Sequence, residues 1–224
     1  MIKAVFLDVD NTLLDFNLSA KEAIIAAFSE LNLPFSDSVM PTFFNVNDEL
    51  WQKIEKKQLT RQELHKIRWQ IVFDKLQINA VGTDMERLFL KNLFDCAILV
   101  EGALDLVKYL SEKYDVYTAS NAPYSQQVNR LTVSGIMPFV KGIMNFESQG
   151  IHKPQKSFFE KCLEAVSPVK TDEIVLIGDS LTADMQGGKA VGFTTIWFNR
   201  QNKEQPNGLC DYTVTKLSEI KNIL

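Results

Sequence analysis

The feature that most constrains the fold of this chain is a short apolar run near the N-terminus that ends on two acids. Ala4 to Leu7 favour a buried strand, and Asp8 and Asp10 follow directly, one residue apart. Along a strand, such carboxylates lie about 6 to 7 Å apart on the same side of the chain, where they repel each other. A divalent cation between them makes the repulsion tolerable, so the stretch predicts a site that binds Mg²⁺ and phosphate, with Asp8 as nucleophile and Asp10 as proton donor. The alternative is an Asx-type turn after the strand, in which Asp10 and Asn11 only bond the local backbone.

Composition limits the class of protein and of partner. The chain has 224 residues, enough for one large domain or for a core domain plus a smaller one. Its net charge is −4 with no basic block, which argues against a nucleic-acid polymer or an anionic membrane as the main partner but is compatible with a small anionic substrate. No apolar run approaches the ~20 residues that span a bilayer, and the N-terminal run is too short for a signal peptide. The three cysteines are widely spaced without a Cys-x-x-Cys pair, so we expect reduced thiols in a cytoplasmic protein and no zinc site.

The first third of the chain has a helical pattern and no strand pattern. Between about residues 19 and 95, apolar residues recur at helical spacing in four stretches. Three capping-box pairs support helix starts there: Ser19 with Glu22, Thr60 with Glu63, and Thr83 with Glu86. We therefore expect an α-helical domain over residues 16–96. Within it we expect Trp51, Trp69 and Phe44 to be core residues; the alternative is that one of them stacks a base. We expect Arg61 and Arg68 to lie on a solvated face; the alternative is contact with a ribose or base edge.

From residue 101 onward, predicted strands alternate with predicted helices. This alternation indicates a doubly wound parallel sheet, and we predict an α/β, Rossmann-like core domain built from residues 1–15 and 97–224. In such sheets, ligands bind beyond the carboxyl ends of the strands. Any polar residue that follows a predicted strand is therefore a candidate for the same site as Asp8.

Polar residues follow the later strands too. Ser120 and Asn121 end a middle strand just before a helix, where a hydroxyl, an amide and free N–H groups could bind phosphate. Lys153 stands at the start of another helix, where a cation is unfavourable to the helix dipole unless it faces an anion. Asp179 follows a late strand and Asp184 lies five residues on, so both could join a Mg²⁺ site. The alternatives are a solvated lysine and a first-turn acid that favours the helix dipole.

Taken in order, Asp-x-Asp-x-Thr, Ser-Asn, Lys-Pro and Gly-Asp-x-x-x-x-Asp form a constellation that resembles the haloacid dehalogenase-like (HAD) superfamily over the whole chain. The resemblance implies that Asp8 is the nucleophile and Asp10 the general acid/base, and that an α-helical cap is inserted between the first and second motifs. It further implies that Ser120, Asn121 and Lys153 surround the phosphoryl group. Mg²⁺ would be bound by Asp8, the backbone carbonyl of Asp10 and Asp179, with Asp184 close by. Because the halide-displacing branch lacks a carboxylate at position 10, phosphoryl transfer is favoured over dehalogenation.

A narrower resemblance points to a substrate class. The segments Leu14–Asn17, Lys153–Lys156 and Gly178–Asp184 are similar to those of bacterial pyrimidine 5′-nucleotidases. One departure is Ser120-Asn121-Ala122, where that branch has Thr-Asn-Gly; serine keeps the hydroxyl, while alanine reduces backbone freedom. The alternatives are a sugar-phosphate phosphatase of the N-acylneuraminate 9-phosphate type, a phosphomutase, and a phosphate-binding regulatory protein with low turnover.

Overall fold

The computed structural model describes residues 1–204 and 208–224. These residues form two compact units. One comprises Met1–Phe16 and Ala97–Leu224 and is called the core unit below; the other, Asn17–Cys96, is called the helical unit.

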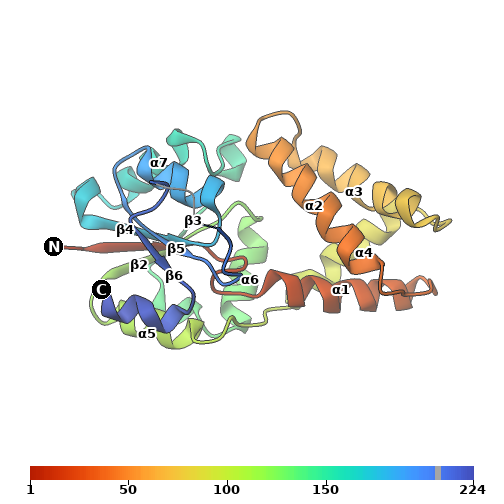
Figure 1. Ribbon diagram of the computed structural model, residues 1–224, viewed down its shortest axis with the longest axis horizontal. Coiled ribbons are helices and arrows are strands. Elements are labelled where there is room, and N and C mark those ends of the chain that lie inside the picture. Colours follow the sequence, from red (N-terminus) through yellow and green to blue (C-terminus); the bar gives the residue numbers. More distant parts are fainter. Residues whose placement is uncertain (205–207) are drawn as a thin grey trace. The chain divides into compact units, whose positions relative to one another are not determined.

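The core unit contains a parallel sheet with helices on both faces, which confirms the predicted α/β fold. Its described strands lie in the order β3-β2-β1-β4-β5-β6, and each neighbouring pair is parallel. Their bounds are β1 Ala4–Leu7, β2 Asp115–Ala119, β3 Gly142–Met144, β4 Ile174–Gly178, β5 Thr194–Phe198 and β6 Tyr212–Val214. The first strand of the chain thus lies in the middle of the sheet, between β2 and β4 (Figure 1).

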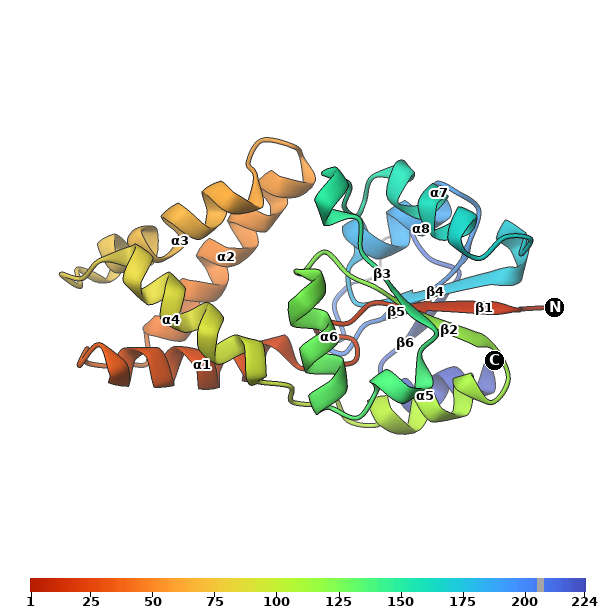
Figure 2. The same cartoon turned by 180° about the vertical axis from the view of Figure 1, so that it is seen from behind.

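Alternation along β1 explains how the sheet is covered on both sides. Val5 and Leu7 face a cluster that includes residues of α5 and α6, whereas Phe6, between them, faces Phe158 of α7. Figure 2 shows α5 and α6 on one side of the sheet and α7 and α8 on the other. The helices of this unit are α5 Ala103–Ser111, α6 Tyr124–Val133, α7 Lys156–Ala165 and α8 Gly187–Lys189, with a π-helical turn at Leu181–Gln186 and 3₁₀ turns at Met137–Phe139, Glu147–Gln149, Thr171–Glu173 and Leu217–Asn222.

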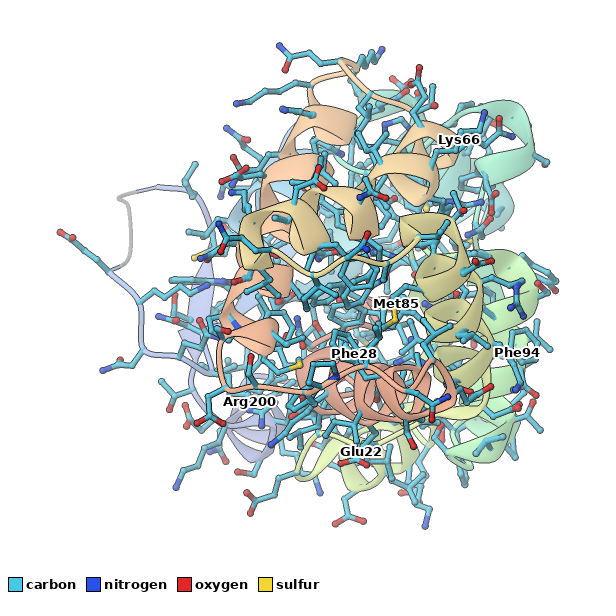
Figure 3. The ribbon with its side chains drawn as sticks, turned by 90° about the vertical axis from the view of Figure 1, so that its right-hand side faces the viewer. Glu22, Phe28, Lys66, Met85, Phe94 and Arg200 are labelled. Carbon is cyan, nitrogen blue, oxygen red and sulfur yellow. The ribbon has the colours of Figure 1, made fainter. Side chains whose placement is uncertain are left out.

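The helical unit has an aromatic core. Its described helices are α1 Phe16–Glu30, which begins at the boundary, α2 Val39–Glu55, α3 Arg61–Leu76 and α4 Gly82–Asp95. Trp69 is fully buried and stacks on Phe43 with ring centroids 5.0 Å apart. Phe28 and Met85 are buried among the same helices, whereas Lys66 is exposed (Figure 3). None of the helices in the described part of the chain is both long and apolar enough to cross a membrane.

Two of the local predictions for this unit were wrong for the same reason. Arg68 does not lie on a solvated face: it is 3% exposed and donates to Glu86 at 2.6 and 3.1 Å and to Asn47 at 2.8 Å. Glu86 therefore does not cap α4, and the capping box predicted for it is absent, since the preceding N-cap is Val81. A buried guanidinium needs a partner from another helix, and this tertiary pairing overrides the local pattern.

Of the other two predicted capping boxes, one is present and the other is absent. The Thr60–Glu63 box is confirmed, with Glu63 N donating to Thr60 Oγ1 at 3.2 Å and Thr60 N donating to Glu63 at 2.8 Å. Ser19, in contrast, is buried inside α1, because that helix begins three residues earlier, at Phe16.

The two segments of the core unit that flank the helical insert are bonded to each other. Leu14 and Leu99 form an antiparallel bridge, Val100 N donates to Leu13 O at 2.9 Å, and Asp15 N donates to Ile98 O at 2.7 Å. The chain therefore leaves and re-enters the core unit at one place.

Candidate functional site

Strand register brings the predicted site residues of three strands to one edge of the sheet. Leu7, the last residue of β1, lies opposite Thr118 of β2 and Ile177 of β4. Because the strands are parallel, the residues that follow them share the carboxyl edge. Asp8, Ser120 and Asp179 are those residues.

Lys153 links two of the carboxylates at this edge. It is 2% exposed, and its Nζ lies 2.6 Å from Asp8 Oδ1 and 2.6 Å from Asp184 Oδ1. Burial alone would lower the pKa of Lys153, but the Asp184 and Asp8 carboxylates raise it, so the ammonium stays charged. Thr12 donates from its hydroxyl to the other Asp8 oxygen, Oδ2, at 2.9 Å.

Asn121 holds the backbone of Lys153. Its Nδ2 donates to Lys153 O at 3.0 Å, and its Oδ1 accepts from Lys153 N at 2.8 Å. Both ends of the Asn121 amide are thus used in fixing the backbone of Lys153. Ala122 causes no strain, since it is not among the described residues with positive φ.

Asp8, Asp179 and Asp184 form a group that fits a hard cation. One carboxylate oxygen of each lies within 4.8 Å of the others. Oxygen atoms of carboxylates are the ligands that Mg²⁺ prefers. Burial raises the pKa of Asp8 to about 7, with Lys153 acting against the shift, and burial together with the Asp8 charge raises the pKa of Asp179. One ammonium does not balance three carboxylates, and a divalent cation would.

Local backbone features place Asp184 in this group. Gly178 ends β4, and a Cβ added there would lie 2.3 Å from Asp184 Oδ2, so only glycine leaves room for the carboxyl group. The following segment starts as the π-helical turn at Leu181–Gln186. Ser180 caps that turn by accepting from Ala183 N at 3.0 Å, and its own N–H donates to Asp184 Oδ2 at 3.2 Å.

The Asp10 carboxylate lies outside the three-carboxylate group and is bound by α6. Arg130 donates to its Oδ1 at 2.5 Å, and Gln127 donates to its Oδ2 at 2.8 Å. The same Gln127 nitrogen donates to Ser120 Oγ at 2.8 Å. Sequence reasoning missed Gln127 and Arg130, although two polar residues three apart on the helix after Ser120-Asn121 were a usable signal.

Comparison with known proteins identifies the family. The family model of haloacid dehalogenase-like hydrolases matches residues 2–192. The chain belongs to this family.

This HAD-like hydrolase has relatives that align over nearly all of its length. It is 31% identical to YfnB of Bacillus subtilis (strain 168), over 99% of this chain and 95% of YfnB. It is 30% identical to the pyrimidine 5′-nucleotidase PynA of Streptococcus pneumoniae, over 90% of this chain and 86% of PynA. The pyrimidine 5′-nucleotidase YjjG of Escherichia coli (strain K12) is 24% identical, over 98% of this chain and 96% of YjjG.

Solved structures agree with the HAD-like fold. The crystal structure of the orthorhombic form of YfnB from Bacillus subtilis, bound to magnesium, superposes with a TM-score of 0.94 at 31% identity and covers 100% of this chain and 98% of that one. The L-2-haloacid dehalogenase of Xanthobacter autotrophicus superposes with a TM-score of 0.75 at 13% identity over 100% and 98% of the two chains, which shows a shared fold.

Proposed function

We propose that this hydrolase is a Mg²⁺-dependent phosphomonoesterase that acts on nucleoside 5′-monophosphates, with pyrimidine nucleotides preferred. The observation that carries the proposal is the Asp8 carboxylate, held between Thr12 and Lys153 and next to two further carboxylates. A carboxylate fixed on one side by an ammonium is suited to attack phosphorus, because the cation screens it from the substrate anion. The pyrimidine 5′-nucleotidases PynA and YjjG, both aligned over most of the chain, support the substrate class.

In the first step, an Asp8 oxygen forms a bond to phosphorus as the bond from phosphorus to the ester oxygen breaks. The leaving oxygen takes a proton from Asp10. Lys153 and the Ser120 hydroxyl contact the phosphoryl oxygens, and the nucleoside departs as an alcohol.

In the second step, a water oxygen attacks the phosphorus of the aspartyl-phosphate. Asp10, now a carboxylate, takes a proton from that water, and the bond from phosphorus to the Asp8 oxygen breaks. Inorganic phosphate leaves, and Asp8 and Asp10 return to their starting states.

The residues proposed to hold Mg²⁺ are Asp8, Asp179 and the backbone carbonyl of Asp10, with Asp184 next to them. When bound, Mg²⁺ supplies positive charge that offsets the carboxylates and the transferring phosphoryl group. The magnesium-bound crystal structure of YfnB supports the choice of ion.

We further propose that the helical unit is the cap that selects the substrate. Its boundaries, Asn17–Cys96, enclose the segment between the first two motifs. Since Arg68, Trp69 and Glu86 are buried within that unit, substrate contacts would come from its more exposed residues.

A panel of phosphate monoesters with Mg²⁺ tests the proposal. We expect phosphate release from UMP, dUMP and dTMP to exceed release from purine nucleotides, glyceraldehyde 3-phosphate and N-acylneuraminate 9-phosphate. Asp8→Asn protein, purified in the same way, controls for contaminating phosphatases. Turnover of a sugar phosphate without any nucleotide turnover would reject the substrate class, and an isomerised product without released phosphate would favour a phosphomutase.

A further inference from the structure

The face of α6 that meets the sheet edge carries two buried polar side chains, Gln127 and Arg130. Both are 0% exposed. Burying a guanidinium and an amide is costly unless their hydrogen bonds are made, so their contacts decide what they do. Among their contacts are hydrogen bonds to Asp10 and Ser120, the two residues to which the proposed mechanism gives a proton transfer and a phosphoryl contact.

Asp10 is fixed at both of its carboxylate oxygens. Arg130 binds Oδ1 and Gln127 binds Oδ2, so neither rotation about χ1 nor rotation of the carboxyl group is free. The Asp10 side chain is 27% exposed, so solvent alone would leave it several rotamers. Each carboxylate oxygen keeps a second lone pair, which leaves a place for the proton to be donated.

Ser120 is oriented by the same glutamine. Its Oγ accepts from Ala122 N at 3.1 Å and from Gln127 Nε2 at 2.8 Å. A hydroxyl has two acceptor lone pairs and one proton, so two incoming N–H bonds leave its proton to be donated elsewhere. A carboxylate can only accept hydrogen bonds, so Asp10 requires that the nitrogen of the Gln127 amide, and not its oxygen, faces Asp10 and Ser120.

We infer that Gln127 and Arg130 are positioning residues: Arg130 aims the Asp10 carboxyl group at the leaving oxygen, and Gln127 makes Ser120 a hydrogen-bond donor to the phosphoryl group while fixing the second Asp10 oxygen. The inference rests on the proposed phosphatase function. A single nitrogen, Gln127 Nε2, donates to both Asp10 and Ser120, so one side chain orients both residues.

Leaving-group dependence tests the role of Arg130. A nucleotide needs a proton on its departing oxygen, whereas a nitrophenyl phosphate leaves readily without one. General acid catalysis contributes 10²- to 10⁴-fold, so we expect Arg130→Met to lower kcat for the nucleotide by at least about 10-fold and kcat for the nitrophenyl ester much less. Arg130→Lys, which keeps a cation, should recover part of the loss. Equal losses on both esters, or no loss, would overturn this role.

Phosphate binding tests the role of Gln127. Methionine matches glutamine in length but donates no hydrogen bond, so Gln127→Met should weaken inhibition by inorganic phosphate and raise KM, as Ser120 Oγ loses one fixed donor. Unchanged inhibition by inorganic phosphate would overturn this role. Lys141→Met is the matched control, because it removes an exposed ion pair with Asp115 at the first residue of β2.

The two proposals fail in different ways. If the wild-type protein releases no phosphate from any monoester, the phosphatase proposal fails. Binding of inorganic phosphate to Gln127→Met, compared with binding to the wild type, then still tests whether Gln127 orients Ser120 toward phosphate. If the wild type is active and the α6 variants lose activity equally on both esters, only the positioning inference fails. Circular dichroism and the Mg²⁺-dependent increase in Tm must match the wild type in each variant; a loss of the Mg²⁺ effect would show a general disruption and count against a positioning role. If Arg130→Met does not fold, Arg130→Lys is used for the same leaving-group test.

Discussion

Replacing Gly178 with alanine changes the placement of Asp184 without removing any charged group. The new Cβ would lie 2.3 Å from Oδ2, 2.4 Å from Cγ and 2.8 Å from Cβ of Asp184. Ordinary carbon contacts are about 3.5–4.0 Å, so the Asp184 side chain must move by roughly 1 Å or more. A shift of that size breaks the bonds that Asp184 makes to Lys153 Nζ at 2.6 Å and to Ser180 N at 3.2 Å.

The cost follows from those two bonds. Hydrogen bonds to charged groups contribute about 1.5–3 kcal/mol each, so their loss costs about 3–6 kcal/mol. Alanine recovers about 0.4–1 kcal/mol by restricting the unfolded chain. We therefore expect Gly178→Ala to lower the free energy of unfolding by about 2–6 kcal/mol.

Urea unfolding without Mg²⁺ measures this change as a lower midpoint at constant m-value, and a Mg²⁺ titration of the same protein should show weaker binding. Gly142→Ala is the matched control, since Gly142 also lies in a strand and its added Cβ would meet Tyr117 at an ordinary 3.5 Å. The control should stay within about 1 kcal/mol of the wild type. Equal stability of the two variants would refute the reasoning that Gly178 exists to make room for Asp184.

The remaining predictions concern single carboxylates. Asp8→Asn should abolish hydrolysis, because an amide cannot form the acyl-phosphate. Asp115→Asn, at a half-exposed position at the start of β2, should keep wild-type rates, and equal activity of the wild type and both variants would indicate a contaminant. Mg²⁺ at about 100 times its Kd should stabilise the wild type by about 2.7 kcal/mol in thermal unfolding, and Asp179→Asn should reduce that effect, so an undiminished effect would exclude Asp179 as a ligand. Although partial burial acts to raise the pKa of Asp211, its bonds to Lys189 and Thr195 lower it overall. Its stabilisation is therefore present above the unfolded pKa of about 3.9 and is lost as pH falls through the lower folded value. Asp211→Asn should thus cost about 1 kcal/mol at pH 7, allowing for solvent screening, and less in acid; a difference that grows in acid would contradict this.

The sheet and the residues at its carboxyl edge were predictable because they depend on short-range patterns. Apolar runs that end on polar residues located β1 with Asp8 and β4 with Asp179, and parallel topology then required them to meet. The roles proposed for these residues remain predictions. The structure adds that Asn121 binds the backbone of Lys153, which no spacing rule could show because the two residues are 32 positions apart.

What could not be predicted depends on partners that are distant in sequence. Arg68 and Glu86 have the local appearance of a surface residue and a capping residue, yet they pair inside the helical unit. Arg130 likewise meets Asp10 across 120 positions. In each case the fold decides which partner a buried charge meets, so a single sequence can mark the polar residue but does not identify its partner.

The antiparallel bridge between Leu14 and Leu99 makes the helical unit an insert that starts and ends at one place in the core unit. Since the exit and return points are hydrogen-bonded neighbours, roughly eighty intervening residues could be exchanged for a different insert, or shortened to a tight loop, without rerouting any strand. On the proposed role of the helical unit as the cap, exchanging it between relatives would change the substrate range and leave the residues at the carboxyl edge of the sheet unaltered, which makes such chimaeras a practical engineering route.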